Sequence, residues 1–373
     1  MFYKDFNGKS LSLLGLGCMR FPTVEGTGEV DLEKTERIID LAMEKGINYY
    51  DTAWGYLSGK SEEITGRMLK KYPRDSYYIA TKFPGFSKEL IGKAEEVFET
   101  QLARLGMDYV DFYLFHNVCE ADIDNYLDNE KYGHFSYILE QKKKGRIKHL
   151  GFSTHGTLDT VKRFLDAYGE HIEFCQIQLN FLDYYLQDAR AKVELLNERN
   201  IPIWVMEPLR GGRMASLVDG ALSGQSVPSW AFRYLFGIEG VGMILSGMSD
   251  TAQVTENANI FSQHKPLDAN EAAALEAVTQ NMLSKKTLPC TGCRYCTDGC
   301  PMGLDIPLLI GLYNDLCFNG HSFVAETAVA NMPVEKRPGA CIGCRACEDA
   351  CPQNIKISEA MADFAKRLEK IEQ

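Results

Sequence analysis

Residues 77–116 read YYIATKFPGFSKELIGKAEEVFETQLARLGMDYVDFYLFH, and this stretch contains one complete strand–helix–strand unit. Its two apolar, aromatic-rich runs, 77–82 and 109–116, have the length of strands. The segment 89–105 between them has the length and pattern of a helix. Because two strands joined through a helix lie parallel in one sheet, the unit predicts an α/β fold.

The same alternation continues on both sides of this unit. Further apolar or β-branched runs occur at 11–16, 47–51, 147–153, 173–179, 201–206 and 241–246. Eight strand–helix units in roughly 250 residues match a (β/α)8 barrel. An open doubly wound sheet is the alternative, but GLGCMR at 15–20 lacks the third glycine of a dinucleotide-binding fingerprint.

The alternation stops near residue 265. The sequence therefore predicts a barrel over 1–265, a linker with one short helix over 266–288, and a small, mainly helical domain over 289–373. A chain of 373 residues is long for one domain and sufficient for a barrel with an appendage.

Composition and charge exclude several classes of partner. The formal net charge of −11 repels a phosphate backbone, so we expect no nucleic-acid partner. The N-terminal residues lack the pattern of a signal peptide, and no run approaches the roughly 18 apolar residues that span a bilayer. We therefore expect a cytoplasmic protein without a membrane partner.

Four polar residues lie at or just after the ends of three successive predicted strands: Asp51, Tyr56, Lys82 and His116. Barrel enzymes carry their functional residues at this end of the strands. Each residue alone has an ordinary explanation, such as helix capping, packing or solvation, but their joint occurrence favours function.

Carbonyl reduction explains why these residue types belong together. The reaction adds a hydride to carbon and a proton to oxygen, and a tyrosine with an ordinary pKa near 10 could supply the proton. A nearby lysine ammonium lowers that pKa, and an aspartate keeps the lysine charged. A histidine can hydrogen-bond and orient the substrate carbonyl.

Three segments resemble the aldo-keto reductases: DTAWGY at 51–56, ATK at 80–82 and DFYLFH at 111–116. The resemblance extends over about residues 10–262, in order and with similar spacing. It implies a (β/α)8 barrel that binds NADP(H).

Residue roles follow from the same resemblance. It implies Tyr56 as general acid, Lys82 and Asp51 as the pair that tunes it, and His116 as the residue that orients the substrate. Further matching positions imply cofactor contacts at Ser153, Gln176, Met206, Pro208, Leu209, Gly211, Gly247, Ser249, Gln253, Glu256 and Asn257. For Ser153 and Gln176, hydrogen bonding within the barrel is the alternative.

Two positions depart from the family pattern. The family often has an aromatic residue stacked on the nicotinamide where this chain has Met206, and the smaller stacking surface leaves room for a flavin. The family commonly has a basic residue for the 2′-phosphate, but MSDTAQ at 248–253 has none. The sequence therefore leaves NADP(H) and NAD(H) open.

Eight cysteines form two copies of C-x2-C-x2-C-x3-C-P near the C-terminus. They are Cys290, Cys293, Cys296 and Cys300, followed by Cys341, Cys344, Cys347 and Cys351. This pattern is typical of [4Fe–4S] ligation. Zinc sites usually need two C-x-x-C pairs, and disulfides form in oxidising compartments, so both alternatives are weaker.

The repeat resembles two-cluster ferredoxins, in which the fourth cysteine of each run binds the other cluster. The resemblance implies that Cys290, Cys293, Cys296 and Cys351 hold one [4Fe–4S] cluster and that Cys341, Cys344, Cys347 and Cys300 hold the second. Because 40 residues separate the two runs and DIPLLIGLYNDLCFNG between them has helical periodicity, the module also resembles helical ferredoxin domains of fumarate reductase subunits.

Three functions remain open. The first is an NAD(P)H-dependent reductase of small-molecule aldehydes, ketones or quinones, with structural or regulatory clusters. The second is an electron-transfer oxidoreductase whose clusters exchange electrons with a ferredoxin or flavoprotein partner, although the sequence has no convincing separate flavin motif. The third is a non-catalytic redox or nicotinamide sensor, which the four polar residues of the barrel disfavour.

Overall fold

Eight parallel strands close into a barrel. The computed structural model describes residues 1–212, 214, 224–284, 287–290, 294, 296–297, 299–351 and 354–371. The barrel strands are β3 (Leu14–Gly17), β4 (Tyr49–Asp51), β5 (Tyr78–Phe83), β6 (Val110–Phe115), β7 (Ile147–Thr154), β8 (Phe174–Gln178), β9 (Ile203–Met206) and β10 (Val241–Ser246). Each pairs with its neighbours in chain order, and β10 pairs with β3 to close the barrel, which confirms the predicted fold class.

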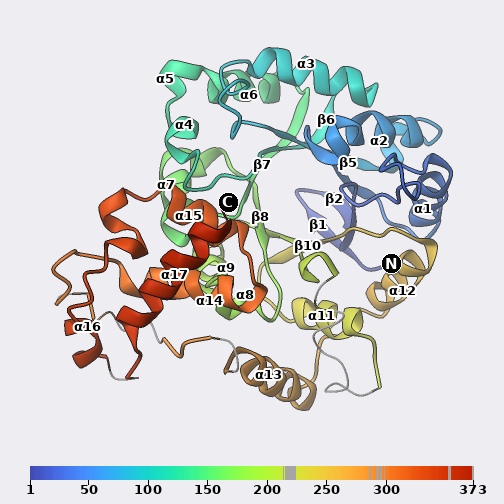
Figure 1. Cartoon of the computed structure of the whole chain (residues 1–373). Coiled ribbons are helices and arrows are strands. Elements are labelled where there is room, and N and C mark those ends of the chain that lie inside the picture. The colour runs from blue at the N-terminus through green and yellow to red at the C-terminus, as the bar shows by residue number, and fades with distance from the viewer. Residues whose placement is uncertain are drawn as a thin grey trace. The chain divides into compact units, whose positions relative to one another are not determined.

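Helices follow the strands and surround them (Figure 1). They are α1 (Leu32–Glu44), α2 (Ser61–Leu69), α3 (Ala94–Leu105), α6 (His134–Lys143), α7 (Leu158–Tyr168), α9 (Ala189–Glu198), α11 (Val227–Phe236) and α12 (Thr251–Gln263), with two short helices, α4 (Ile123–Leu127) and α5 (Asn129–Tyr132), before α6. Every residue of β6 is buried, as expected for a strand that faces the barrel interior on one side and helices on the other.

A hairpin closes the end of the barrel where the strands begin. It consists of β1 (Tyr3–Phe6) and the antiparallel β2 (Lys9–Ser12). The Phe6 ring packs against Phe112, Phe174 and Trp204, with the Trp204 centroid at 5.0 Å. The hairpin therefore covers the N-terminal ends of the strands. The sequence run 11–16 was wrongly taken as one strand, since Leu13 separates the hairpin from the barrel.

The chain divides into two compact units. The barrel unit contains Met1–Phe181 and Ala191–Ala274, and the C-terminal unit contains Leu182–Arg190 and Leu275–Gln373. The division falls inside α13 (Ala269–Ser284). The domain boundaries drawn from the sequence remain a prediction.

The C-terminal unit is helical and has its own core. Its elements are α8 (Asp183–Leu186), α14 (Ile306–Asn319), α15 (Phe323–Ala330), α16 (Ala346–Asp349) and α17 (Ile357–Ile371). Helix α14 contacts α8, α15 and α17. Residues from α14, α15 and α17 form a buried apolar cluster that includes Leu316, Ala325 and Phe364. This core supports the cysteine-bearing loops.

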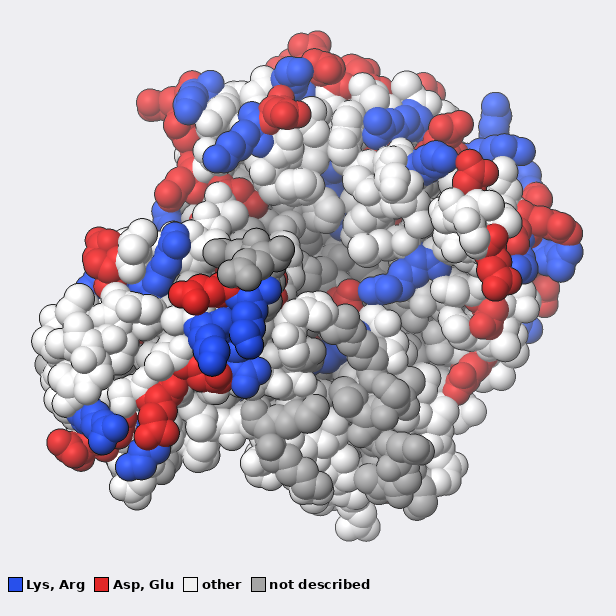
Figure 2. All heavy atoms as spheres, in the orientation of Figure 1, with Lys and Arg blue, Asp and Glu red and all other residues white. Residues whose placement is uncertain are grey.

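Acidic and basic side chains are interspersed on the visible surface (Figure 2). Many form ion pairs within or between helices, such as Lys144 with Glu140 on α6 and Arg146 with Glu99 on α3. Within the described ranges, no helix combines the length and the apolar character needed to cross a membrane.

Candidate active site and cysteine cluster

The barrel brings the four predicted catalytic residues to the rim opposite the hairpin. Asp51 is the last residue of β4, Lys82 the last but one of β5, and His116 directly follows β6. Tyr56 begins a short 3-10 turn after β4. Because β4, β5 and β6 are adjacent strands, their C-terminal ends present these side chains to one another.

Lys82 connects Asp51 and Tyr56. Its ammonium donates hydrogen bonds to Asp51 Oδ1 at 2.5 Å, to the Thr52 carbonyl oxygen at 2.8 Å and to Tyr56 Oη at 3.3 Å. The Lys82 side chain is 0% exposed and that of Asp51 is 3% exposed. A buried ammonium is strongly unfavourable without a partner, so the carboxylate and the two oxygens are what hold the lysine here.

The environment fixes the protonation states of Lys82 and Tyr56. Burial opposes the charge on Lys82, but the Asp51 carboxylate and Tyr56 outweigh it, so the pKa of Lys82 is raised. Burial raises the pKa of Tyr56 more than the Lys82 charge lowers it. Lys82 lowers the pKa of Tyr56, as the sequence predicted, but burial, which the sequence analysis did not consider, makes the net direction upward. Tyr56 carries its proton at neutral pH and can donate it.

His116 lies beside this group as a neutral imidazole. Its ring is 5.8 Å from the Tyr56 ring, edge to face. Burial first, and then the charges of Lys82 and His155, hold the pKa of His116 well below 6.5. Its Nδ1 has no hydrogen-bond partner among the residues that the structure describes. A neutral histidine keeps one ring N–H for hydrogen bonding without competing for the tyrosine proton.

Ser153 and Gln176 lie on the next two strands of the rim. They are paired across β7 and β8, and Gln176 Nε2 donates to Met206 Sδ at 3.7 Å. Ser153 Oγ accepts a hydrogen bond from the Asn117 backbone N–H at 2.9 Å. The fold thus brings together Ser153 and Gln176, the polar residues that the sequence assigned to the nicotinamide. It also places Asn117 beside Ser153, and the sequence analysis missed Asn117.

Several buried polar atoms at this part of the rim lack a hydrogen-bond partner within the described residues. Within the described part of the chain, Asp51 Oδ2, Asn117 Oδ1 and Gln176 Oε1 have no hydrogen-bond partner. Buried polar atoms are costly to leave unpaired, and two amide oxygens near Ser153 fit a ligand carboxamide that donates N–H groups. Asn117 also has a φ of 54°, which asparagine tolerates better than most residues.

Met206 ends β9, and the loop after it carries Pro208, Leu209 and Gly211. Its backbone is turned tightly, with φ of 54° at Glu207 and 66° at Gly211. The Glu207 carbonyl accepts a hydrogen bond from Asn180 Nδ2 at 3.0 Å, which ties the loop to the end of β8.

The loop after β10 carries Gly247 and Ser249 and leads into α12. Ser249 N–H donates to Gln253 Oε1 at 2.8 Å, and Asp250 caps the helix by accepting from the Gln253 N–H. Asn257 is buried and donates to Ser246 Oγ at 3.2 Å. The exposed Glu256 instead lines a separate pocket between α11 and α12.

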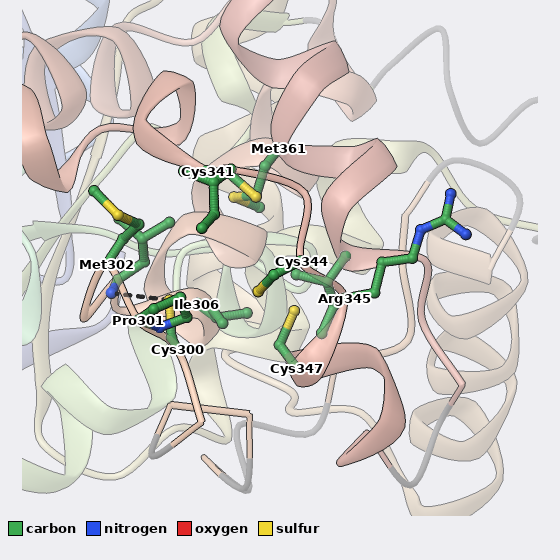
Figure 3. Close-up of a pocket in the computed structure, with 12 residues that line it drawn as sticks. Cys300, Pro301, Met302, Ile306, Cys341, Cys344, Arg345, Cys347 and Met361 are labelled. Atoms are coloured by element: carbon green, nitrogen blue, oxygen red, sulfur yellow. Dashed lines mark hydrogen bonds between the residues drawn. The ribbon is translucent and has the colours of Figure 1, made fainter.

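Four of the predicted cluster ligands line one pocket of the C-terminal unit (Figure 3): Cys300, Cys341, Cys344 and Cys347. Most of the other lining residues are apolar, among them Leu304, Ile306 and Met361, and Arg345 is the charged one among those described. Thiolates in an apolar setting are the ligand type that iron–sulfur clusters require, so the residues fit a [4Fe–4S] cluster.

The ligands predicted for the other cluster are Cys290, Cys293, Cys296 and Cys351, and the structure describes only some of them. Cys290, Cys300, Cys341 and Cys351 pack against the C-terminal core, and Cys296 and Cys347 belong to it. Cys293 lies outside the described residues. The backbone N–H of Leu304 donates to Cys300 Sγ at 3.5 Å, which is a contact of the kind that tunes cluster sulfurs.

Comparison with known proteins agrees with both units. Residues 13–223 match the model of the aldo/keto reductase family, and residues 282–352 match that of a 4Fe-4S dicluster domain. A probable aldo-keto reductase 1 of Glycine max is 33% identical over 216 residues, covering 55% of this chain and 58% of the soybean protein.

Two further similar proteins match this chain over a larger share of their own length. The NADH-specific methylglyoxal reductase of Escherichia coli is 29% identical, over 60% of this chain and 70% of that protein. The holo form of an aldo-keto reductase from Bacillus halodurans shares the fold, with a TM-score of 0.62 at 24% identity, over 74% of this chain and 96% of that structure. The chain therefore belongs to the aldo/keto reductase family of oxidoreductases and carries a 4Fe-4S domain after its barrel.

Proposed function

We propose that the barrel is an NAD(P)H-dependent reductase of small aldehydes, ketones or quinones. The observation that carries the proposal is the buried Lys82, which hydrogen-bonds Asp51 and Tyr56 at the ligand-accessible rim. A buried ion pair that contacts a phenol is costly to maintain for structure alone, and it suits a site that must stabilise a phenolate.

In this proposal Tyr56 is the general acid. The nicotinamide, when bound, supplies the hydride that is added to the carbonyl carbon. Tyr56 gives its hydroxyl proton to the carbonyl oxygen, and the O–H bond electrons remain on the phenolate. Lys82, 3.3 Å away, stabilises that anion, and Asp51 keeps Lys82 charged. The neutral His116 donates a hydrogen bond to the carbonyl oxygen and orients it.

We assign the carboxamide of the nicotinamide to Ser153, Asn117 and Gln176. The unpaired amide oxygens of Asn117 and Gln176, identified within the described residues, support this assignment. Met206 would contact the face of the nicotinamide ring, because it accepts a hydrogen bond from Gln176 in the described structure. The remaining predicted contacts would hold the sugar and phosphate groups.

The reduction rate should be independent of pH from about pH 7 to about pH 9. The acid form of Tyr56 is lost only as pH rises through its pKa, which burial raises above 10.0. His116 becomes charged only as pH falls through a pKa well below 6.5. Steady-state kcat/KM across this range is the measurement. A basic limb near pH 8 that disappears in Tyr56→Phe would contradict the raised pKa of Tyr56, and one that persists in Tyr56→Phe would belong to another group.

Turnover with a carbonyl panel tests the function. The full chain, loaded with its clusters under anaerobic conditions, would be given NADH or NADPH with methylglyoxal, simple aldehydes, diketones and quinones. Methylglyoxal is included because one relative is named for its reduction. Carbonyl-dependent oxidation of either nicotinamide supports the proposal, and its absence with every compound would refute it.

The C-terminal unit would bind two [4Fe–4S] clusters, with the ligand grouping inferred from the sequence. Supporting this, Cys300 lines the same pocket as Cys341, Cys344 and Cys347, although 40 residues separate Cys300 from Cys341 in the chain. Such clusters carry one electron each when bound.

Iron and acid-labile sulfide analysis checks the number of clusters. We expect about eight of each per wild-type chain and about four in Cys344→Ser, which removes one ligand of the second cluster. Cys317→Ser on α14 is the matched control, because Cys317 is outside both cysteine runs, and it should retain the full content. A wild-type chain with about four irons, or with zinc, would contradict the assignment.

An electron-transfer role with a ferredoxin or flavoprotein partner is the second candidate. Cys344 is exposed, and the neighbouring Ile342 is 65% exposed. An exposed cluster ligand favours one-electron exchange with another protein. Reduction of the clusters by a ferredoxin, coupled to carbonyl turnover without any nicotinamide, would favour this role over the first.

A further inference from the structure

Two hydrogen bonds fix the backbone of His116. Its N–H donates to the Phe83 carbonyl oxygen at the end of β5, at 3.0 Å. Its carbonyl oxygen accepts a hydrogen bond from the hydroxyl of Tyr126 at 2.7 Å. Tyr126 lies on α4, a short helix between β6 and α6, and its side chain is fully buried. One polar group of the His116 backbone is thus held by a barrel strand, and the other by a single side chain.

The ring of Tyr126 fills the space between the ends of β5 and β6. A Cβ atom built on Gly85, in the loop after β5, would come 2.3 Å from Tyr126 Cε1 and 2.8 Å from its hydroxyl oxygen. Because a side chain cannot come this close, residue 85 must be glycine for the hydroxyl to reach His116. The Phe83 carbonyl oxygen lies 3.4 Å from the same hydroxyl. Tyr126 therefore joins the end of β5, which carries Lys82, to His116.

The backbone of His116 determines where its imidazole points. The ring lies beside two aromatic side chains, with centroid distances of 5.8 Å to Tyr56 and 5.4 Å to Phe86, both edge to face. Its Nδ1 has no hydrogen-bond partner within the described part of the chain. The direction of the ring therefore depends on this packing and on the backbone that carries it.

Helix α4 is anchored independently of the Tyr126 hydroxyl. The Tyr126 carbonyl oxygen accepts hydrogen bonds from Tyr168 Oη and from His134 Nε2, each at 3.0 Å. The Leu127 carbonyl oxygen lies 3.2 Å from the same Tyr168 hydroxyl. Removing the Tyr126 hydroxyl should therefore leave the helix in place and affect the His116 carbonyl.

We propose that Tyr126 is a positioning residue for His116, whose backbone it holds so that the imidazole meets the substrate carbonyl beside Tyr56. The inference rests on the proposed function, because it gives His116 the role of orienting that carbonyl. A buried carbonyl oxygen that loses its donor is costly, so the His116 backbone should shift when the hydroxyl is absent. A displacement of about 1 Å at a positioned group can cost up to about 10²-fold in rate. One buried hydroxyl should thus influence the reacting atoms without contacting them.

Tyr126→Phe removes the hydroxyl and keeps the ring. Steady-state kinetics of the cluster-loaded full chain should show kcat for carbonyl reduction lowered by about tenfold. The dissociation constants of NADH and NADPH should stay at the wild-type values, because Asn117 remains held by Ser153.

Tyr168→Phe is the matched control, because it removes a hydroxyl that donates to the same helix without touching His116. Both variants lose one hydrogen bond to or from α4, so their melting temperatures should fall by similar amounts. Tyr168→Phe should nevertheless keep kcat within about twofold of the wild type. Equal losses of kcat in the two variants would mean that Tyr126 only supports the helix, and would overturn the inference.

A His116→Gln background shows whether the effect passes through His116. In that background Tyr126→Phe should lower kcat no further, because the group that the hydroxyl positions is gone. A further tenfold loss would mean that Tyr126 acts through Lys82 or Tyr56, and would overturn the inference.

Nitrogen-15 NMR of the histidine rings tests the inference without turnover. The His116 ring signals, identified by their absence from His116→Gln, should shift in Tyr126→Phe and stay unchanged in Tyr168→Phe. Unchanged signals in Tyr126→Phe would overturn the inference. A wild type that reduces no carbonyl, but whose His116 signals respond to Tyr126→Phe, would refute the proposed function and still support the positioning of His116.

Discussion

Replacing Tyr56 by phenylalanine is expected to lower kcat for carbonyl reduction by about 10²- to 10⁴-fold, the range for loss of a general acid. The phenyl ring keeps its contact with His116, and only the hydroxyl next to Lys82 is removed. Because the cofactor is assigned to other residues, NADH and NADPH should bind with unchanged affinity. Steady-state kinetics together with titration of the cofactor would separate the two effects.

Tyr72→Phe is the matched control for this prediction. Tyr72 is also half-buried and its hydroxyl donates to Asp40 at 2.5 Å, but it lies on the outer layer of the barrel after α2. Its loss should leave kcat within about twofold of the wild type, since nothing near the reacting atoms changes. If Tyr56→Phe and Tyr72→Phe retain the same rate, Tyr56 is not the proton donor.

Replacing Lys82 by methionine is expected to abolish measurable turnover and to destabilise the barrel by about 3 kcal/mol. The substitution leaves the Asp51 carboxylate buried among apolar surroundings without its ion-pair partner. It also removes the charge that stabilises the Tyr56 phenolate after proton donation. For a barrel of this size, such a loss should lower the melting temperature by about 10 °C, which calorimetry or circular dichroism would detect.

The double variant Lys82→Met with Asp51→Leu distinguishes stability from catalysis. Replacing both partners of a buried ion pair by apolar residues is often nearly neutral for stability. We therefore expect the melting temperature to return toward the wild-type value while turnover stays absent. Recovery of activity in the double variant would mean that the charge on Lys82 has no part in the reaction.

The barrel was predictable because strand and helix periodicities alternate without interruption. β6 illustrates this, since a six-residue run buried on both faces can only be a central strand. The hairpin was not separable from β3, because Leu11, Leu13 and Leu14 are all buried and the single polar residue between them, Ser12, is buried as well. Only the pairing of β1 with β2 reveals that the first part of the run turns away.

The rim residues were predictable to the extent that they lie on strand ends. Asp51, Lys82 and His116 follow directly from the fold, because parallel strands deliver their C-terminal ends to one rim. Contacts between distant loops of the rim were not predictable in this way: Arg20 is 227 positions from Gly247 in the chain and meets it only when β3 closes against β10.

The direction in which the surroundings shift the pKa of Tyr56 was the least predictable property of the site. Sequence spacing indicates that Lys82 lies near Tyr56, and the structure gives 3.3 Å between them. Spacing does not indicate how deeply the phenol is buried, and burial is the larger influence on its pKa. Whether a tyrosine next to a lysine is protonated therefore depends on packing that only the folded chain defines.

The most direct measurement of the central claim is the fate of deuterium during reduction. The cluster-loaded protein would reduce an aldehyde with NADH or NADPH carrying deuterium at C4 of the nicotinamide, and mass spectrometry of the alcohol would follow. Direct hydride transfer predicts one deuterium on the carbinol carbon, and none there when unlabelled cofactor is used in D2O. A product whose carbon-bound hydrogen comes from solvent would show that electrons arrive singly, and would contradict the account.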